Sequence, residues 1–133
     1  MKPKVVAVAV VLMIGACSTA EYDVTASDLD LAPPGIDLEE DVTYRYKFYI
    51  HCGMEWLHSF NGEAWITDEP IYNGVGRAPD GLRPFFVNPD EVISPELWTQ
   101  ITLVSADEIR LTLPDGSRAS TYHPSDEDWP GCA

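Results

Sequence analysis

The stretch from Asp41 to Asp68 limits the fold of this chain more than any other part of the sequence. From Val42 to Ile50, apolar and aromatic residues occupy every second position, and mostly polar or charged residues lie between them. This period of two predicts a β-strand with one buried face, because successive side chains of a strand point to opposite sides. Gly53 then interrupts the pattern, as a bend or a bulge requires.

A hairpin follows, and its signal is the pair Asn61-Gly62. The pair predicts a type I′ turn, because both central residues of that turn need a positive φ, which Asn tolerates and Gly adopts freely. A two-residue loop also sets the pairing of the two strands. We expect Phe60 opposite Glu63 and, at the far end, Trp56 opposite Thr67. One face of this hairpin carries Trp56, His58, Phe60 and Trp65, and the other carries Leu57, Ser59, Ala64 and Ile66.

The aromatic face of the hairpin has two interpretations. In the first, its rings form the core, and the aliphatic face lies outward or under a loop. In the second, its tryptophans flank a partner site beside the turn, because exposed Trp side chains supply contact area and a hydrogen-bond donor at small entropic cost. The second interpretation gives a candidate binding surface of Trp56, His58, Phe60 and Trp65.

The rest of the chain adds short strands and many turns. Residues 68–90 are rich in Pro, Gly and Asn, while Ser94-Pro95-Glu96 has the composition of a helix start, for which we expect one turn. Alternation returns over residues 99–104, 109–113 and 117–122, which predicts an antiparallel meander. The predicted fold class is therefore all-β: a small antiparallel barrel or a two-layer sandwich with one disulfide.

Residues 1–16 have the pattern of an export signal. Lys2 and Lys4 precede an apolar run that is too short to span a bilayer, and the run ends in Ile14-Gly15-Ala16-Cys17. Here the sequence resembles a bacterial lipoprotein signal, whose lipobox is an aliphatic residue, two small residues and a cysteine. The resemblance implies that Cys17 is lipidated and becomes the mature N-terminus, which anchors the protein to the cell membrane on its extracytoplasmic side. The alternative is an ordinary secreted protein that is cut nearby.

The next segment, residues 17–41, reads as an acidic tether. It contains Pro33-Pro34-Gly35 and many acidic side chains but no basic residue, a composition typical of disorder. Alternatively, its isolated aliphatic side chains let it dock on the domain as an extended arm; these are Leu29, Leu31, Ile36 and Leu38. The folded domain is expected over residues 42–133.

Two cysteines remain once Cys17 is lipidated. Cys52 and Cys132 form an even pair in an oxidising compartment, which predicts a disulfide that closes a loop of about 80 residues. The alternative is a metal site or a catalytic thiol at His51-Cys52. The order of the elements also resembles small secreted and lipid-anchored proteins of actinobacteria, on the residues His51-Cys52-Gly53, Asn61-Gly62 and Cys132. That resemblance implies a fold and a location, and it implies no chemistry.

Charge and motifs exclude several functions. The sequence has 22 acidic and 8 basic residues, and loss of Lys2 and Lys4 with the signal leaves a formal charge near −16. Such a surface repels nucleic acid and anionic lipid, so neither is expected as a partner. We expect no catalytic residue, metal or cofactor, because no serine elbow occurs, and because His51 and Glu55 share a strand face that His58 does not.

Three functions stay open for the domain. The one we expect is a tethered interaction module that binds an envelope protein or a cell-wall component. The others are a structural envelope lipoprotein without a specific ligand, and a hydrolase whose site the sequence does not reveal.

Overall fold

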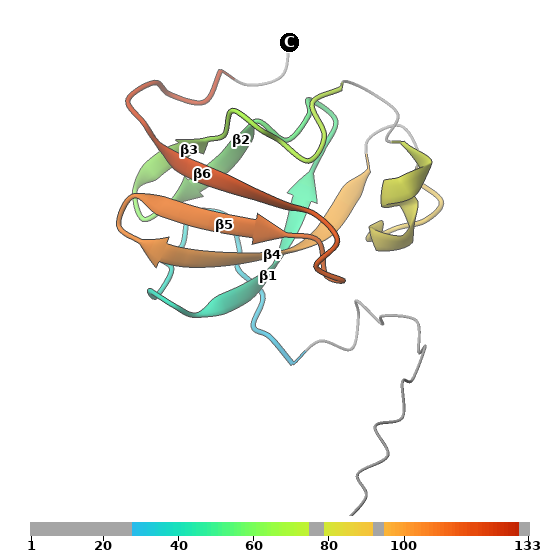
Figure 1. Cartoon of the computed structure of the whole chain (residues 1–133), viewed down its shortest axis with the longest axis horizontal. Coiled ribbons are helices and arrows are strands. Elements are labelled where there is room, and N and C mark those ends of the chain that lie inside the picture. The colour runs from blue at the N-terminus through green and yellow to red at the C-terminus, as the bar shows by residue number, and fades with distance from the viewer. Residues whose placement is uncertain (1–27, 75–78, 92–94, 131–133) are drawn as a thin grey trace, which may run out of the picture.

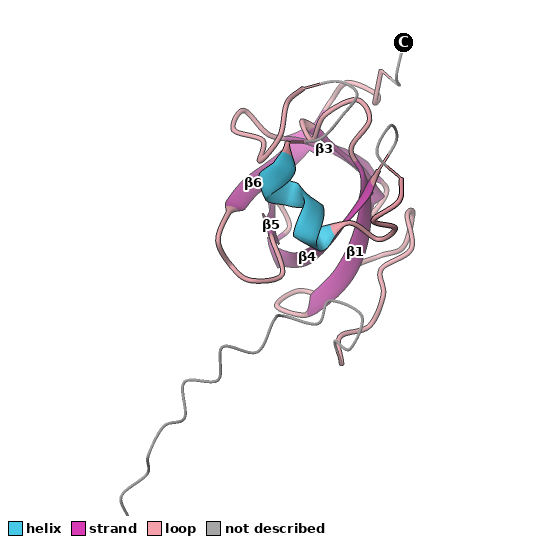
Figure 2. Ribbon diagram, turned by 90° about the vertical axis from the view of Figure 1, so that its right-hand side faces the viewer, coloured by secondary structure: helices cyan, strands magenta, loops and turns pink. Residues whose placement is uncertain are grey.

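The structure, a computed structural model, describes residues 28–74, 79–91 and 95–130. In this part of the chain, six strands form one sheet of neighbouring antiparallel strands in the order β1-β4-β5-β6-β3-β2. Figures 1 and 2 show the sheet curled into a half-barrel, with a short 3-10 helix across one end. The prediction of an all-β antiparallel domain is confirmed. The elements are β1 (Thr43–Tyr49), β2 (Trp56–Phe60), β3 (Glu63–Ile66), η1 (Asp80–Phe85), β4 (Glu96–Ser105), β5 (Glu108–Thr112) and β6 (Ala119–Ser125).

Strand β1 has the predicted alternation from Tyr46 onward, whereas Val42 lies before the strand and is 37% exposed. Tyr46, Phe48 and Ile50 are buried, while Lys47 and Tyr49 between them are exposed. The strand ends in a turn in which the Gly53 N–H donates to the Ile50 carbonyl at 3.0 Å. Gly53 has a φ of +84°, and a Cβ there would approach the backbone of Asn73 at 3.3 Å. Any other residue would therefore strain this turn.

The meander is also confirmed, as strands β4, β5 and β6. The expected helical turn at Ser94-Pro95-Glu96 is wrong where the chain is described, since β4 begins at Glu96. In the strand, Leu97 is fully buried and the Pro95 carbonyl accepts a hydrogen bond from the Ile50 N–H at 3.2 Å. Pairing with β1 thus overrides the local helix-start signal.

The hairpin turn forms as predicted, but the pairing beyond it differs. Asn61 and Gly62 have φ values of 54° and 73°, and Phe60 lies opposite Glu63. A β-bulge then shifts the register, so that Leu57 pairs with Trp65 rather than with Ile66. The extra residue in β2 turns both Phe60 and Leu57 toward the interior, where both are fully buried. The two predicted faces of the hairpin are therefore wrong.

The two outermost strands of the sheet, β1 and β2, are joined across the seam between them. Inside, the Tyr46 and Phe60 rings meet edge to face at 5.3 Å. Outside, the segment of residues 28–41 lies across the seam, and we call it the arm. The Ala32 N–H donates to the Arg45 carbonyl of β1 at 2.8 Å, and the Gly35 N–H donates to the Ser59 carbonyl of β2 at 2.8 Å. In a closed barrel the two edge strands would hydrogen-bond to each other. Here the arm forms backbone bonds with both of them instead.

The sequence left open whether this segment is a disordered tether or docks on the domain. Ala32 and Leu38 are 2% and 4% exposed, and Ile36 packs partly buried against the core. Residues 28–41 therefore dock on the domain, and the expected boundary at Val42 falls inside the folded unit. The rest of the predicted tether, the signal of residues 1–16, Cys17 and Cys132 lie outside the described residues. No helix in the described ranges is long and apolar enough to cross a membrane.

Candidate functional site

The binding surface predicted on the hairpin is not an exposed aromatic patch. Trp65 and Phe60 are fully buried, and the Trp65 Nε1 donates to the Phe60 carbonyl at 3.0 Å inside the core. Trp56 is half-buried, and the His58 side chain lies outside what the structure describes. The interpretation in which the rings form the core is thus correct for Phe60 and Trp65. These two rings are therefore not available to a partner.

The outer surface of β5 and β6 carries the groove that the structure does offer. Arg110 lies directly opposite Thr121 in the ladder, and both side chains are exposed. They point outward because their neighbours in the strands are buried: Ile109 and Leu111 in β5, and Ser120 and Tyr122 in β6. One wall of the groove is the segment that follows β3, residues 67–69.

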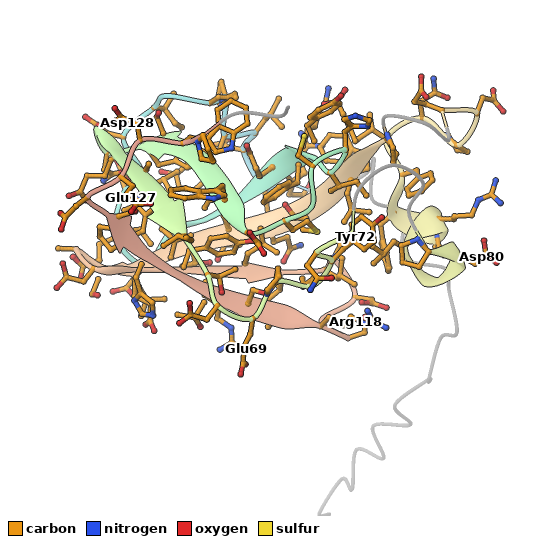
Figure 3. The ribbon with its side chains drawn as sticks, turned by 90° about the horizontal axis from the view of Figure 1, so that it is seen from above. Glu69, Tyr72, Asp80, Arg118, Glu127 and Asp128 are labelled. Atoms are coloured by element: carbon orange, nitrogen blue, oxygen red, sulfur yellow. The ribbon has the colours of Figure 1, made fainter. Side chains whose placement is uncertain are left out.

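Hydrogen bonds fix this wall. The Ser120 hydroxyl donates to the Glu69 carbonyl at 2.7 Å, and the Glu69 N–H donates to the Thr67 hydroxyl at 3.3 Å. The Thr67 N–H in turn donates to the Glu55 carbonyl at 2.9 Å. Figure 3 shows Glu69 on the outer side of β6, far from Glu127 and Asp128 beyond the end of that strand. Two buried hydroxyl groups and one backbone bond therefore fix the backbone of residues 67–69.

The groove is open, and three of its four charged side chains are acidic. Its volume is about 600 Å³, within the usual range for small-ligand sites. We define the polar groove by its charged side chains and His123; Thr67, Ser120 and Thr121 also line it, as do the apolar residues Val104 and Ala119. Those defining residues are Asp68, Glu69, Glu108, Arg110 and His123.

Arg110 is the one basic residue of the polar groove. Within the described residues, the ion pair between Arg83 and Asp80 at 4.0 Å is the only one. The Arg110 guanidinium is thus exposed in a groove with three carboxylates, yet it forms no ion pair with any of them. Its donors remain available for the carboxylate or other acceptor group of a ligand.

His123 adds an imidazole ring to the groove. Its Nδ1 lies 3.1 Å from the Asp107 carbonyl oxygen, which orients the ring. No carboxylate in the described part of the chain lies within ion-pair distance of this ring. The nearby Ser120 hydroxyl is already used to hold Glu69. This geometry suits the binding of a polar ligand, and it contains no base-activated nucleophile.

The other histidine with a described side chain sits apart from the groove. His51 lies beside Tyr49, with ring centroids 5.9 Å apart. In the ranges that the structure describes, no group of three or more His, Cys, Asp or Glu side chains is placed to hold a metal ion.

Sequence reasoning missed the polar groove for a definite reason. The alternation of β5 and β6 does place Arg110 and Thr121 outward, but many other outward residues look the same in the sequence. What makes the groove is the pairing of β3 with β6, where Ile66 lies opposite His123. That contact joins segments far apart in the chain, and no local pattern signals it.

The chain matches no family model, and neither a curated protein nor a solved structure is significantly similar to it.

Proposed function

We propose that the protein is a lipid-anchored, extracytoplasmic binding module that holds a polar component of the bacterial envelope in its polar groove. The observation that carries this proposal is the exposed Arg110 guanidinium, which has no ion-pair partner in the described residues although it lies in a groove with three carboxylates. Such a lining favours a ligand with both ammonium and carboxylate groups, as peptides have.

The lipobox pattern supports the anchor. Ile14-Gly15-Ala16-Cys17 follows a basic start and an apolar run, and two acyl chains on Cys17 would hold the protein stably in the membrane. Replacement of Cys17 by Ala should abolish palmitate labelling and move the protein out of the membrane fraction. A variant that still labels and sediments with membranes would show that the anchor is not at Cys17.

A disulfide between Cys52 and Cys132 belongs to the same proposal. Cys52 lies in the turn after β1, and Cys132 lies beyond the last described residue, Pro130. Both cysteines would face an oxidising compartment, in which such pairs persist. The bridge would hold the C-terminal tail against the end of β1, close to the wall of the half-barrel.

The binding role can be tested by affinity capture from envelope extract. The bait is the chain from Ser18, which lacks the lipidated cysteine but keeps the whole described domain. A double variant, E108A with R110A, removes one acid and one base from the groove. The matched control, D80A with R83A, removes the same two charge types from the exposed pair on η1.

We expect components that the wild-type and control baits retain and the groove variant loses. Circular dichroism of the three baits should be identical, because all four replaced side chains lie at or near the surface. If the groove variant retains the same components as the wild type, the polar groove is not the binding site. If none of the baits retains any component, the structural-lipoprotein alternative replaces the binding module.

A further inference from the structure

A second surface, on the outer side of β1 and β4, has the opposite charge character to the rest of the protein. Alternate residues of β1 and the turn after it point away from the core, and Trp98 of β4 lies opposite Lys47 on the same side. Trp98 is not part of the buried core cluster, although it is only 8% exposed. We call this surface the β1–β4 strip and define it as Arg45, Lys47, Tyr49, His51 and Trp98.

Two cations cover the Trp98 ring. The Arg45 Cζ lies 5.3 Å from the ring centroid, and the Lys47 Nζ lies 5.4 Å from it. Both distances fit cation–π contacts. Among the residues that the structure describes, neither cation pairs with a carboxylate. Two like charges therefore lie side by side without a counter-ion, in a protein whose formal charge is −14 over the full sequence.

The strip also carries exposed aromatic surface. Tyr49 is 46% exposed and is flanked by His51, whose ring lies 5.9 Å away. Tyrosine with Lys and Arg is the side-chain combination enriched where proteins meet lipid headgroups. One carboxylate lies near this end of the strip, because Glu96 pairs with Tyr49 across the ladder.

The chain enters the domain beside this strip. The Arg45 Nε donates to the Leu29 carbonyl at 2.8 Å, and the Arg45 N–H donates to the Asp30 carbonyl at 2.8 Å. Figure 1 shows the arm reaching the domain next to β1. Ten residues separate Cys17 from Asp28, and a chain of that length spans at most on the order of 35 Å. A lipid on Cys17 would thus keep the domain within about that distance of the bilayer.

We propose that the β1–β4 strip is the face on which the anchored domain rests against the anionic headgroups of its own membrane. The inference rests on the proposed lipid anchor at Cys17. Each basic side chain near an anionic bilayer strengthens binding to it about fivefold. That gain in affinity is small for a free domain with a net negative charge. For a tethered domain such a small gain is enough, because the tether turns binding into an intramolecular step.

Asp30 of the arm and Glu96 of β4 lie beside the strip, but no acidic residue belongs to it. Acidic side chains gather where β1 begins, on the arm, on the turn between β4 and β5, and after β6. Tyr49 and His51 lie at the other end of β1. The net charge predicts repulsion from anionic lipid because it averages over the whole surface. The fold brings Arg45 and Lys47 together over one ring, and a tethered domain can turn that side to the membrane.

Lys47 offers a direct measurement, because it is the only lysine after Lys4 in the sequence. A water-soluble amine-acetylating reagent therefore reports on the strip through a single side chain, read by mass spectrometry. The full mature chain is tethered to vesicles by an N-terminal histidine tag on nickel-chelating lipid in place of the acyl chains. One set of vesicles contains phosphatidylcholine alone, and the other also contains phosphatidylglycerol.

We expect Lys47 to be acetylated about fivefold more slowly on the phosphatidylglycerol vesicles than on the neutral ones. Salt at about 0.5 M should remove the difference, since it screens surface charges. R45Q should weaken the protection, whereas R118Q, which removes an exposed base elsewhere, should leave it unchanged.

Two results would overturn the proposal: equal acetylation on both kinds of vesicle, or protection that R45Q and R118Q reduce alike. The histidine tag keeps this test separate from lipidation. Failure of palmitate labelling at Cys17 would remove the natural anchor, whereas equal acetylation of the tagged chain would remove the membrane-facing role of the strip.

Discussion

Trp65 decides between the two interpretations of the hairpin's aromatic face, a buried core or an exposed partner site. Its side chain is fully buried, and its Nε1 donates to the Phe60 carbonyl within the core. We expect W65A to lower the free energy of unfolding by about 3–5 kcal/mol, because it leaves a large cavity and an unpaired carbonyl. Urea unfolding followed by circular dichroism measures the change.

Trp129 provides the matched control for this prediction. It is 40% exposed, beyond the end of β6. W129A should change the free energy of unfolding by no more than about 1 kcal/mol. If W65A were as mild as W129A, the buried position of Trp65 and the packing of β3 described above would be wrong.

Tyr46 and Tyr122 make the stability of the fold depend on alkaline pH. Burial raises the pKa of both phenols far above the usual value, and the Tyr122 hydroxyl donates to the Met54 carbonyl. In the unfolded chain both ionise near pH 10. Their contribution is therefore complete below about pH 10 and is lost as the pH rises above it, because only the unfolded chain then releases the protons.

We expect the urea midpoint to be level from pH 8 to about pH 9.5 and to fall steeply beyond pH 10. Y46F and Y122F each remove one titrating group, so each should flatten the fall. Y122F should also lower stability by about 1–2 kcal/mol at pH 8, since it leaves the Met54 carbonyl without its donor. A midpoint that falls equally in all three proteins would assign the pH dependence to other groups.

At the scale of elements, local patterns predicted the strands better than their partners. The alternation of β1 and the Asn61-Gly62 turn were both correct, because each depends on neighbours in the sequence. The bulge in β2 was not predictable, since it arises from the need to bury Leu57 and Phe60 together. The composition of the arm suggested disorder, yet a few buried apolar side chains and backbone bonds to β1 and β2 dock it in the seam.

Asn61 links the hairpin to the arm and gives a prediction for this element. The Leu38 N–H donates to the Asn61 Oδ1 at 2.8 Å, and the Asn61 Nδ2 donates to the Leu38 carbonyl at 3.2 Å. N61G keeps the positive φ of 54° accessible but removes both bonds. We expect hydrogen exchange at the Leu38 amide to become faster, while the amides of β5 stay protected.

The control for N61G is N73G. Asn73 is exposed and lies in a loop away from the arm. That substitution should leave exchange in the arm unchanged. If N61G also has no effect on the Leu38 amide, the side-chain bonds do not hold the arm, and its docking depends on its backbone bonds and on buried apolar side chains.

For the whole molecule, the sequence predicted the fold class but not the site. An all-β domain follows from the number of alternating segments, whereas the polar groove depends on β3 meeting β6. The same argument applies to charge. The composition predicts an acidic protein, and only the folded arrangement shows that Arg45 and Lys47 cover one Trp98 ring. Surfaces assembled from distant segments carry no local signal.

The proposed bridge between Cys52 and Cys132 is a property of the whole chain, because it would close a loop of about 80 residues. In the chain-entropy model, such a loop stabilises the fold by about 4–5 kcal/mol. The chain from Ser18 should show no free thiol when it is denatured without reductant. Reduction should lower its melting temperature, and a double variant, C52S with C132S, should melt at that lower temperature with or without reductant. Two free thiols in the unreduced protein, or a melting temperature that reduction leaves unchanged, would show that the half-barrel and its arm hold together without the bridge.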